Sequence, residues 1–160
     1  MIETRKIGWE ELEILIRKVA KFISSQGQFD AVVGVARGGL VCAGMLAVAL
    51  GSPNLHSIRV IHYGEGKPPN ELFSHPVVER PDFETQGRSF VLVDDIISTG
   101  MTLEEAKMRL LQMGSRRVLT ASVFAKPHPR FPPDFFSESE ARCVIFPWEE
   151  RPIQRRKSGK

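Results

Sequence analysis

The sequence has 160 residues, enough for one domain with a sizeable core, and its 42% hydrophobic and 26% charged residues are ordinary for a soluble globular protein. No apolar run approaches the ~20 residues that cross a bilayer, and the first residues lack the basic-then-apolar order of a signal peptide, so we expect a cytoplasmic protein without a membrane partner. The two cysteines, Cys42 and Cys143, form no CxxC pair, which argues against a zinc site or a disulfide framework, and we expect both to be reduced and buried.

The predicted elements alternate between helices and strands from the start of the chain. Apolar residues at helical spacing predict an amphipathic helix over residues 9–25. A continuous apolar run predicts a buried strand over 30–36, and a turn at 37–39 leads into a helix over 39–50. A second strand is expected over 57–62.

Residues 64–87 differ from the rest because they are rich in glycine and proline. They predict a long loop, with room for a short hairpin, and long loops in compact domains often act as lids. The apolar segment 89–93 predicts a strand, and residues 94–101 predict a loop after it.

Thr102 and Glu105 form the pattern of a capping box, which predicts a helix that starts at Thr102 and ends before Gly114. The segment 117–125 predicts a fourth strand, and prolines then interrupt regular structure until a short strand over 143–146.

These elements predict an α/β fold, in which a mostly parallel central sheet is covered by helices on both faces, because the central strands are apolar along their whole length. We expect one domain over residues 1–150. The net charge of +3 comes largely from the tail 151–160, which is typical of a solvated, partly disordered end. A basic arm for nucleic acid is the weaker alternative, because no nucleic-acid motif accompanies it.

Ligands of open α/β sheets bind beyond the carboxyl ends of the strands, where Asp94 and Asp95 follow an apolar strand. Two adjacent carboxylates repel each other and need partners such as sugar hydroxyls or a magnesium-bound phosphate. Residues 98–102 then offer hydroxyls and successive backbone N–H groups at a helix N-terminus, which suits a phosphate. The pattern is not a Walker A loop. A purely structural role for the acids and for Thr102 is the alternative.

Residues 91–102 (VLVDDIISTGMT) resemble the phosphoribosyl diphosphate signature of type I phosphoribosyltransferases. The resemblance implies that Asp94 and Asp95 hold the ribose hydroxyls, that the following loop binds the 5′-phosphate, and that Mg²⁺ is held mostly through the donor. The residues that it assigns to this part of the site are Asp94, Asp95, Ile96, Ile97, Ser98, Thr99, Gly100, Met101 and Thr102.

Residues 34–40 (GVARGGL) resemble the diphosphate loop of the same family. The resemblance implies that Arg37 and the backbone N–H groups of Gly38 and Gly39 hold the leaving diphosphate, and that the peptide between Ala36 and Arg37 is cis. An arginine suits this role because its fork of donors matches phosphate oxygens.

Residues 123–127 (VFAKP) and 143–149 (CVIFPWE) resemble the base site and the hood of the 6-oxopurine enzymes, most closely the bacterial xanthine–guanine type. The resemblance implies that Lys126 contacts the oxygen on purine C6, and that Cys143, Val144 and Ile145 meet the base. It also implies a small hood built from residues 127–150 with the N-terminus, and a homo-oligomer.

The resemblance therefore implies a purine salvage enzyme, in which Arg37, Asp94 and Asp95 act on an oxocarbenium-like transition state. The family usually has an acid at the position of Ser98, and serine is not a general base at neutral pH without activation. This departure leaves a transferase with a non-purine acceptor as one alternative. A regulatory or RNA-binding protein that keeps the fold is the other, and only the basic tail favours it.

Overall fold

The computed structural model of the chain describes residues 3–61 and 76–149. In these ranges the elements in chain order are β1 (Thr4–Lys6), α1 (Trp9–Ser25), β2 (Ala31–Ala36), α2 (Gly38–Leu50), β3 (Leu55–Ile61), β4 (Val77–Val78), β5 (Ser89–Ile97), α3 (Met101–Gln112), β6 (Arg117–Ala125), β7 (Phe135–Ser139), β8 (Cys143–Ile145) and the 3-10 turn η1 (Pro147–Glu149).

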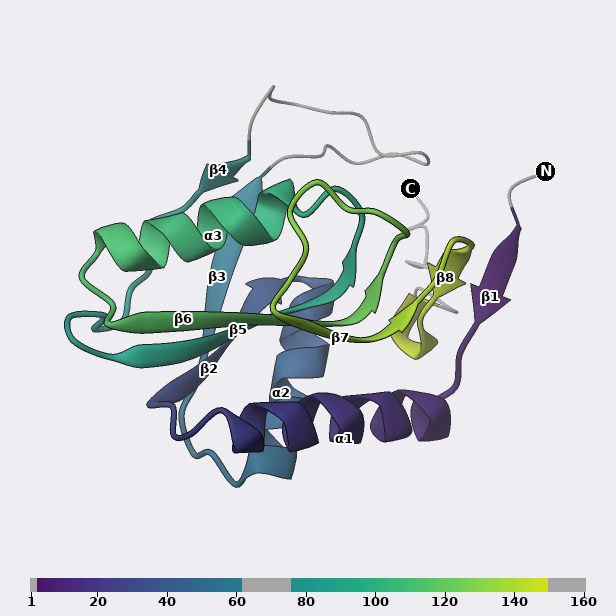
Figure 1. Ribbon diagram of the computed structural model, residues 1–160, viewed down its shortest axis with the longest axis horizontal. Helices are drawn as coiled ribbons and strands as arrows, with labels where there is room; N and C mark the ends of the chain where they lie inside the picture. Colours follow the sequence, from purple (N-terminus) through teal and green to yellow (C-terminus); the bar gives the residue numbers. More distant parts are fainter. Residues whose placement is uncertain (1–2, 62–75, 150–160) are drawn as a thin grey trace, which may run out of the picture.

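The main sheet has six strands in the order β4-β3-β2-β5-β6-β7. All neighbouring pairs are parallel except β3 with β4, which is antiparallel at the edge. Figure 1 shows α3 on one face of this sheet and α1 with α2 on the other. The predicted α/β class, with a mostly parallel sheet covered on both faces, is confirmed.

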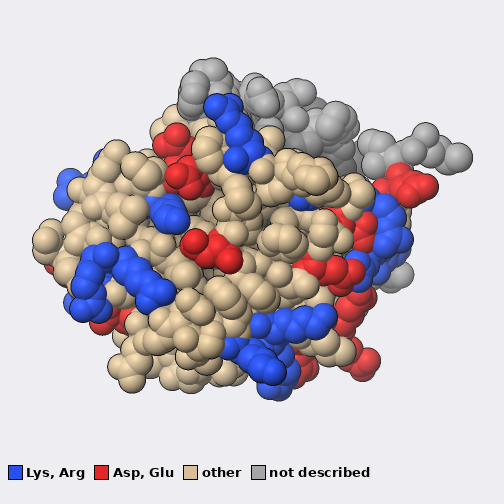
Figure 2. Space-filling view, in the orientation of Figure 1, with Lys and Arg blue, Asp and Glu red and all other residues tan. Residues whose placement is uncertain are grey.

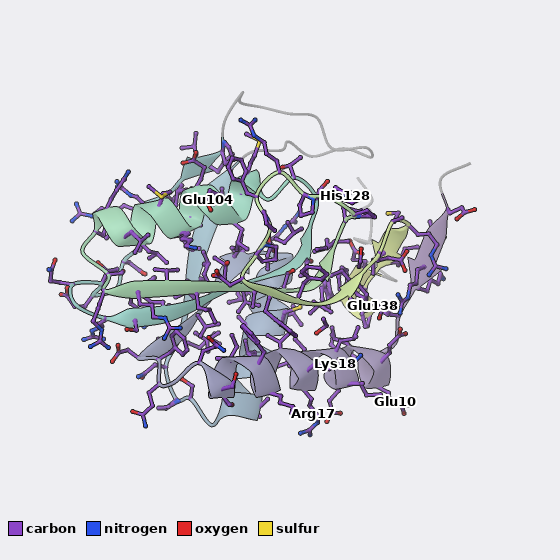
Figure 3. All side chains as sticks on the ribbon, in the orientation of Figure 1. Glu10, Arg17, Lys18, Glu104, His128 and Glu138 are labelled. Atoms are coloured by element: carbon purple, nitrogen blue, oxygen red, sulfur yellow. The ribbon has the colours of Figure 1, made fainter. Side chains whose placement is uncertain are left out.

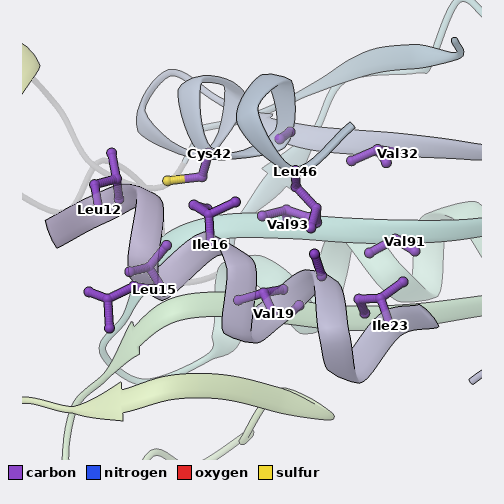
Figure 4. Close-up of a cluster of buried hydrophobic side chains, with 14 of the residues drawn as sticks. Leu12, Leu15, Ile16, Val19, Ile23, Val32, Cys42, Leu46, Val91 and Val93 are labelled. Carbon is purple, nitrogen blue, oxygen red and sulfur yellow. The ribbon is translucent and has the colours of Figure 1, made fainter. Parts of the chain in front are cut away.

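Alternate residues of the central strands supply the two cores. Val91 and Val93 of β5 join α1 and α2 in one buried cluster, shown in Figure 4. Phe90 and Leu92 of the same strand join α3 in the other cluster. All four side chains are at most 1% exposed. Because the strand is buried on both faces, its sequence is a continuous apolar run and not an alternating one.

A two-stranded parallel sheet of β1 and β8 forms a hood at one side of the molecule (Figure 1). Aromatic rings line it: Phe146 stacks on Trp148 at 4.6 Å between centroids, and Trp148 meets Trp9 at 6.2 Å. The predicted hood from the two ends of the chain is therefore present. Its strand β1 was not predicted from the sequence.

Charged side chains tie the hood to the body of the protein. Arg5 bonds Glu11, Glu138 and Glu140 at 2.6, 2.7 and 2.8 Å, and Arg142 bonds Glu140 at 2.7 Å. We call these five residues the hood cluster. Figure 2 shows acidic and basic side chains gathered along this edge, and Figure 3 labels Glu138 between the hood and α1.

Two sequence predictions around the acidic pair were wrong. Residues 94–97 are not loop, because β5 continues to Ile97 and pairs with β6 as far as Ala125. Helix α3 begins at Met101 and not at Thr102, since its cap is Gly100, with φ of +86° and no side-chain cap bond. A glycine suits this cap because side chains rarely adopt a positive φ, and a Cβ there would overlap the carbonyl of Phe131.

Other predictions need smaller changes. Strand β3 starts at Leu55 and ends at Ile61, and strand β7 was not predicted. Cys42 is buried as expected, but Cys143 is exposed on the hood edge, which corrects its prediction. Residues 64–75 of the predicted loop 64–87 and the whole tail 151–160 lie outside the described residues, and the described part of that loop contains the short strand β4. Among the helices that are described, none has the length and apolarity of a membrane span.

We expect the hood cluster to make the protein sensitive to acid. Arg142 and Arg5 hold the pKa of Glu140 far below its usual range, and Arg5 lowers the pKa of Glu138. Carboxyls of this kind stabilise the fold above their ordinary pKa, and the stabilisation is lost as pH falls toward the lowered values. The free energy of unfolding should therefore fall below about pH 5, and less steeply in Glu140→Gln.

Urea unfolding at several pH values measures this slope. Fluorescence reports it well, because the two tryptophans of the chain, Trp9 and Trp148, lie at the hood. Glu13→Gln is the matched control, since Glu13 pairs with Arg17 on the exposed surface of α1. An equal slope in wild type and Glu140→Gln would contradict the assignment.

Candidate functional site

The carboxyl ends of β2, β3 and β5 meet the first turns of α2 and α3 around one cavity of about 580 Å³. The residues that line it are Val35, Ala36, Arg37, Gly38, Arg59, Val60, Ile61, Asp94, Ile96, Ile97, Ser98, Thr99, Gly100, Thr102 and Leu103. Two segments that are far apart in the sequence, 35–38 and 94–103, therefore share one site. Its place agrees with the rule that open α/β sheets bind ligands beyond their strand ends.

Asp94 and Asp95 sit near the end of β5, and both residues are only partly exposed. The N–H of Asp95 donates to Asp94 Oδ1 at 2.9 Å, and the N–H of Ile96 donates to Asp95 Oδ1 at 2.7 Å. Burial raises the pKa of Asp94 well above its usual value, and the charge of Asp95 raises it further. Burial likewise raises the pKa of Asp95. The pair therefore favours a ligand that donates hydrogen bonds or brings positive charge.

The first turn of α2 packs directly on this acidic pair. A Cβ on Gly38 would overlap the carboxylate of Asp95, and one on Gly39 would lie 2.9 Å from Asp94 Oδ1. A real Cβ does not approach other atoms this closely, so only glycine at these two positions lets α2 come this near to the end of β5. The glycines thus lie against the acids, and their role in binding a ligand stays a prediction.

Arg37 is exposed at the start of α2 and lines the cavity, and the peptide before it is cis, as the resemblance implied. A second arginine of the cavity, Arg59, was missed. It lies on β3 opposite Ala36 and bonds Glu79 at 2.7 Å. No motif marked it in the sequence, since only the pairing of β2 with β3 brings it beside the site.

The loop after β5 turns sharply at Gly100 into α3. Ser98 and Thr99 are exposed there, while Ile97 is buried. The N–H of Phe131 donates to the carbonyl of Thr99 at 3.0 Å, so the segment after β6 supports the loop from behind. Residues 98–102 thus form an open helix N-terminus beside the cavity, which favours an anion. Met101 is the first residue of α3, and Thr102 lines the cavity.

The residues predicted to meet the base do not line this cavity: Lys126 follows the end of β6, and Cys143, Val144 and Ile145 form β8 of the hood. Lys126 Nζ donates to the carbonyl of Ala141 at 3.0 Å and to that of Arg142. Cys143 is exposed, Val144 is 8% exposed and part of the core, and Ile145 pairs with Lys6. Their contact with a base stays a prediction.

Glu149 of the hood is a further carboxylate that the sequence did not reveal as a site residue. Its charge helps to raise the pKa of Asp95, although burial is the larger cause. Glu149 Oε2 accepts the N–H of Phe146 at 3.0 Å, which holds it in the turn η1. The hood therefore places a further negative charge, that of Glu149, near the acidic pair.

The sequence and the fold of this chain are similar to those of known proteins. The sequence profile of the phosphoribosyl transferase domain matches residues 8–154. The chain is 28% identical over 151 residues to the xanthine-guanine phosphoribosyltransferase of Gluconobacter oxydans, which covers 92% of this chain and 85% of that protein. It is 30% identical over 153 residues to the protein of that name from Cereibacter sphaeroides, with 89% and 85% covered.

The crystal structure of a purine phosphoribosyltransferase from Pyrococcus horikoshii Ot3 has the same fold. Its TM-score is 0.79 at 26% sequence identity, over 98% of this chain and 100% of that one. The sequence profile spans most of the chain, and residues of the segment 91–102 line the cavity described above. The chain therefore belongs to the phosphoribosyltransferase domain family.

Proposed function

We propose that this chain transfers the 5-phosphoribosyl group from phosphoribosyl diphosphate to a 6-oxopurine (xanthine, guanine or hypoxanthine) and releases diphosphate. The observation that carries the proposal is the acidic pair held against Gly38 and Gly39, with Asp94 lining the same cavity as Ser98, Thr99, Gly100 and Thr102. The named relatives are xanthine-guanine phosphoribosyltransferases, which supports the choice of base.

In this proposal Asp94 and Asp95 accept hydrogen bonds from the ribose hydroxyls, while residues 98–102 bind the 5′-phosphate. The bond from ribose C1′ to the diphosphate oxygen breaks, a bond from C1′ to purine N9 forms, and the proton on purine N7 is lost to solvent. Arg37, with the N–H groups of Gly38 and Gly39, stabilises the charge that develops on the leaving diphosphate. Positioning both reactants accounts for much of the remaining rate.

Magnesium fits the acidic pair, because burial raises the pKa values of both carboxyls and the charge of Asp95 raises that of Asp94 further, so a cation would stabilise their ionised forms. In the described ranges, no three His, Cys, Asp or Glu side chains are arranged to hold a metal by themselves. We therefore propose that Asp94 and Asp95 hold Mg²⁺ mostly through donor oxygens, as this ion prefers. When bound, it would neutralise part of the diphosphate charge.

Ser98 favours a second candidate, a transferase with a non-purine acceptor. The residue is exposed on the cavity, and its hydroxyl is a poor base at neutral pH. Xanthine is acidic enough to react partly as an anion, so it needs no base from the protein. A regulatory or RNA-binding role draws support only from the basic tail, which lies outside the described residues.

We also propose a cytoplasmic homo-oligomer. Helix α2 has no charged residue, and its Val48 and Leu40 are 83% and 38% exposed. Exposed apolar surface of this kind on a helix favours contact with another protein surface.

A panel of acceptors tests the proposed reaction. The purified chain with Mg²⁺ and phosphoribosyl diphosphate should form nucleotide with xanthine, guanine or hypoxanthine, and not with adenine, uracil or orotate, as measured by chromatography. Asp94→Asn together with Asp95→Asn should abolish donor binding, and unchanged binding would overturn the site. Product with uracil or orotate alone would establish the second candidate.

The glycine contact gives a sharper test. Gly38→Ala should weaken donor binding roughly tenfold or more, because its Cβ displaces the carboxylate of Asp95. Gly44→Ala is the control in the same helix, since a Cβ there meets only Leu55 at 4.0 Å. Calorimetric titration with phosphoribosyl diphosphate and Mg²⁺ measures both, and equal affinities would contradict the proposed geometry.

Asp94→Asn should stabilise the ligand-free protein while it impairs function. A carboxyl whose folded pKa is raised adds stability below its unfolded pKa and loses it as pH rises through the folded value. The melting temperature of Asp94→Asn should therefore exceed that of wild type by a few degrees at pH 8. The difference should shrink near pH 4, since Asp94 is then protonated. A lower melting temperature at pH 8 would show that ionised Asp94 is well compensated.

A further inference from the structure

A turn of residues 140–142 lies against the end of β6, directly beside Lys126. The N–H of Glu140 donates to the carbonyl of Ala125 at 2.9 Å. The ammonium of Lys126 donates in return to the carbonyls of Ala141 and Arg142. Two hydrogen bonds thus join the turn to Lys126, and a third joins it to the preceding residue, Ala125.

This contact fixes an otherwise flexible side chain. A lysine ammonium has three N–H donors and no acceptor, and its long stem carries about 2 kcal/mol of rotamer entropy. Two donors are used by the turn, which leaves one N–H of Lys126 for a further acceptor. Because the two carbonyls fix the nitrogen, that last donor is confined to a narrow range of positions.

The shape of the turn depends on one carboxylate, that of Glu140. Its Oε1 accepts the backbone N–H and the Nε–H of Arg142, both at 2.9 Å, and its Oε2 accepts Arg142 Nη2 at 2.7 Å. Oε2 also accepts Arg5 Nη1 at 2.8 Å. The residue is only 5% exposed. Glu140 therefore closes the turn on itself and ties it to β1.

The hood has other attachments that do not involve Glu140. Strands β1 and β8 pair along three residues each, and the N–H of Cys143 donates to the carbonyl of Glu3 at 3.0 Å. Arg5 keeps Glu11 and Glu138 as partners. Loss of the Glu140 carboxylate therefore frees the 140–142 turn more than it frees the hood as a whole.

We propose that Glu140 is a positioning residue, which holds the carbonyls of the 140–142 turn where they orient the ammonium of Lys126 toward the carbonyl oxygen of the base. The inference rests on the proposed function and on the contact between Lys126 and that oxygen that the resemblance implies. Glu140 acts through Lys126 and does not touch the substrate. Its removal should affect binding of the base and leave binding of the donor unchanged.

A double-mutant cycle between Glu140→Ala and Lys126→Met tests this, with guanine or xanthine as acceptor. Glu140→Ala should raise the KM for the base roughly tenfold, the effect of one misplaced charged hydrogen bond, with the KM for the donor unchanged. In the Lys126→Met background, Glu140→Ala should cause no further rise in the KM for the base. Glu140→Gln keeps one oxygen that accepts from Arg142, so its KM should be intermediate.

Glu138→Ala is the matched control, because it removes another carboxylate partner of Arg5 that does not bond the turn. It should leave both KM values as in wild type. If circular dichroism shows that Glu140→Ala does not fold, the cycle is run with Glu140→Gln instead. The same comparison of KM values in the two backgrounds then tests the positioning role.

The outcomes separate this inference from the proposed function. If Lys126→Met leaves the KM for the base unchanged, the assigned role of Lys126 is wrong. If Lys126→Met raises it but the Glu140 variants do not, only the positioning role is overturned. An equal rise from the Glu140 variants in both backgrounds would also overturn it, because Glu140 would then act through the packing of the hood.

Discussion

The close contact of α2 with the end of β5 is the constraint on which the site depends. Gly38 and Gly39 bring backbone against two carboxylates, and no other residue type leaves room for this. The contact buries the carboxylates, and burial raises their pKa values. We therefore expect the arrangement to lower the stability of the ligand-free protein, as is usual for a site that is preorganised for a ligand.

The hood is stabilised by a different set of contacts. Its small sheet has only three residues in each strand, too few to be stable alone. Packing of Phe146 and Trp148 and the ion pairs of Arg5 hold it in place. These pairs share partners in a partly buried network, which makes them stronger than isolated surface pairs. Side-chain contacts therefore add to the short backbone pairing that holds the hood, whereas close backbone approach shapes the acidic pair.

Much of the fold could be predicted because local patterns determine it. The helix 9–25 and the apolar strands follow from periodicity alone, and the acids and glycines of the site follow from their positions at strand ends. Strand β1 could not be predicted, since its three residues are ordered by pairing with β8 at the other end of the domain. Residues 94–97 look like loop because they begin with two acids, yet pairing with β6 keeps them in the strand.

Local patterns likewise predict part of the candidate site. Its acidic pair and its anion-binding turn are contiguous in sequence, so a motif reveals them. Arg59 and Glu149 reach the site only through tertiary structure, from a neighbouring strand and from the hood. The cap at Gly100 depends on contact with Phe131, which no local pattern shows.

The pairing of β5 with β6 has a consequence for how such an enzyme can diverge. The ladder continues as the N–H of Lys126 donates to the carbonyl of Ile97 at 2.7 Å, so the spacing between the anion-binding turn and the lysine is built into the sheet. The other predicted base contacts, Cys143, Val144 and Ile145, belong instead to the hood. If those contacts form, substitutions in the hood change the choice of acceptor and leave the acidic pair and the turn 98–102 as they are. A new acceptor specificity on this fold then evolves through changes in the hood, which is small and is attached separately from the main sheet.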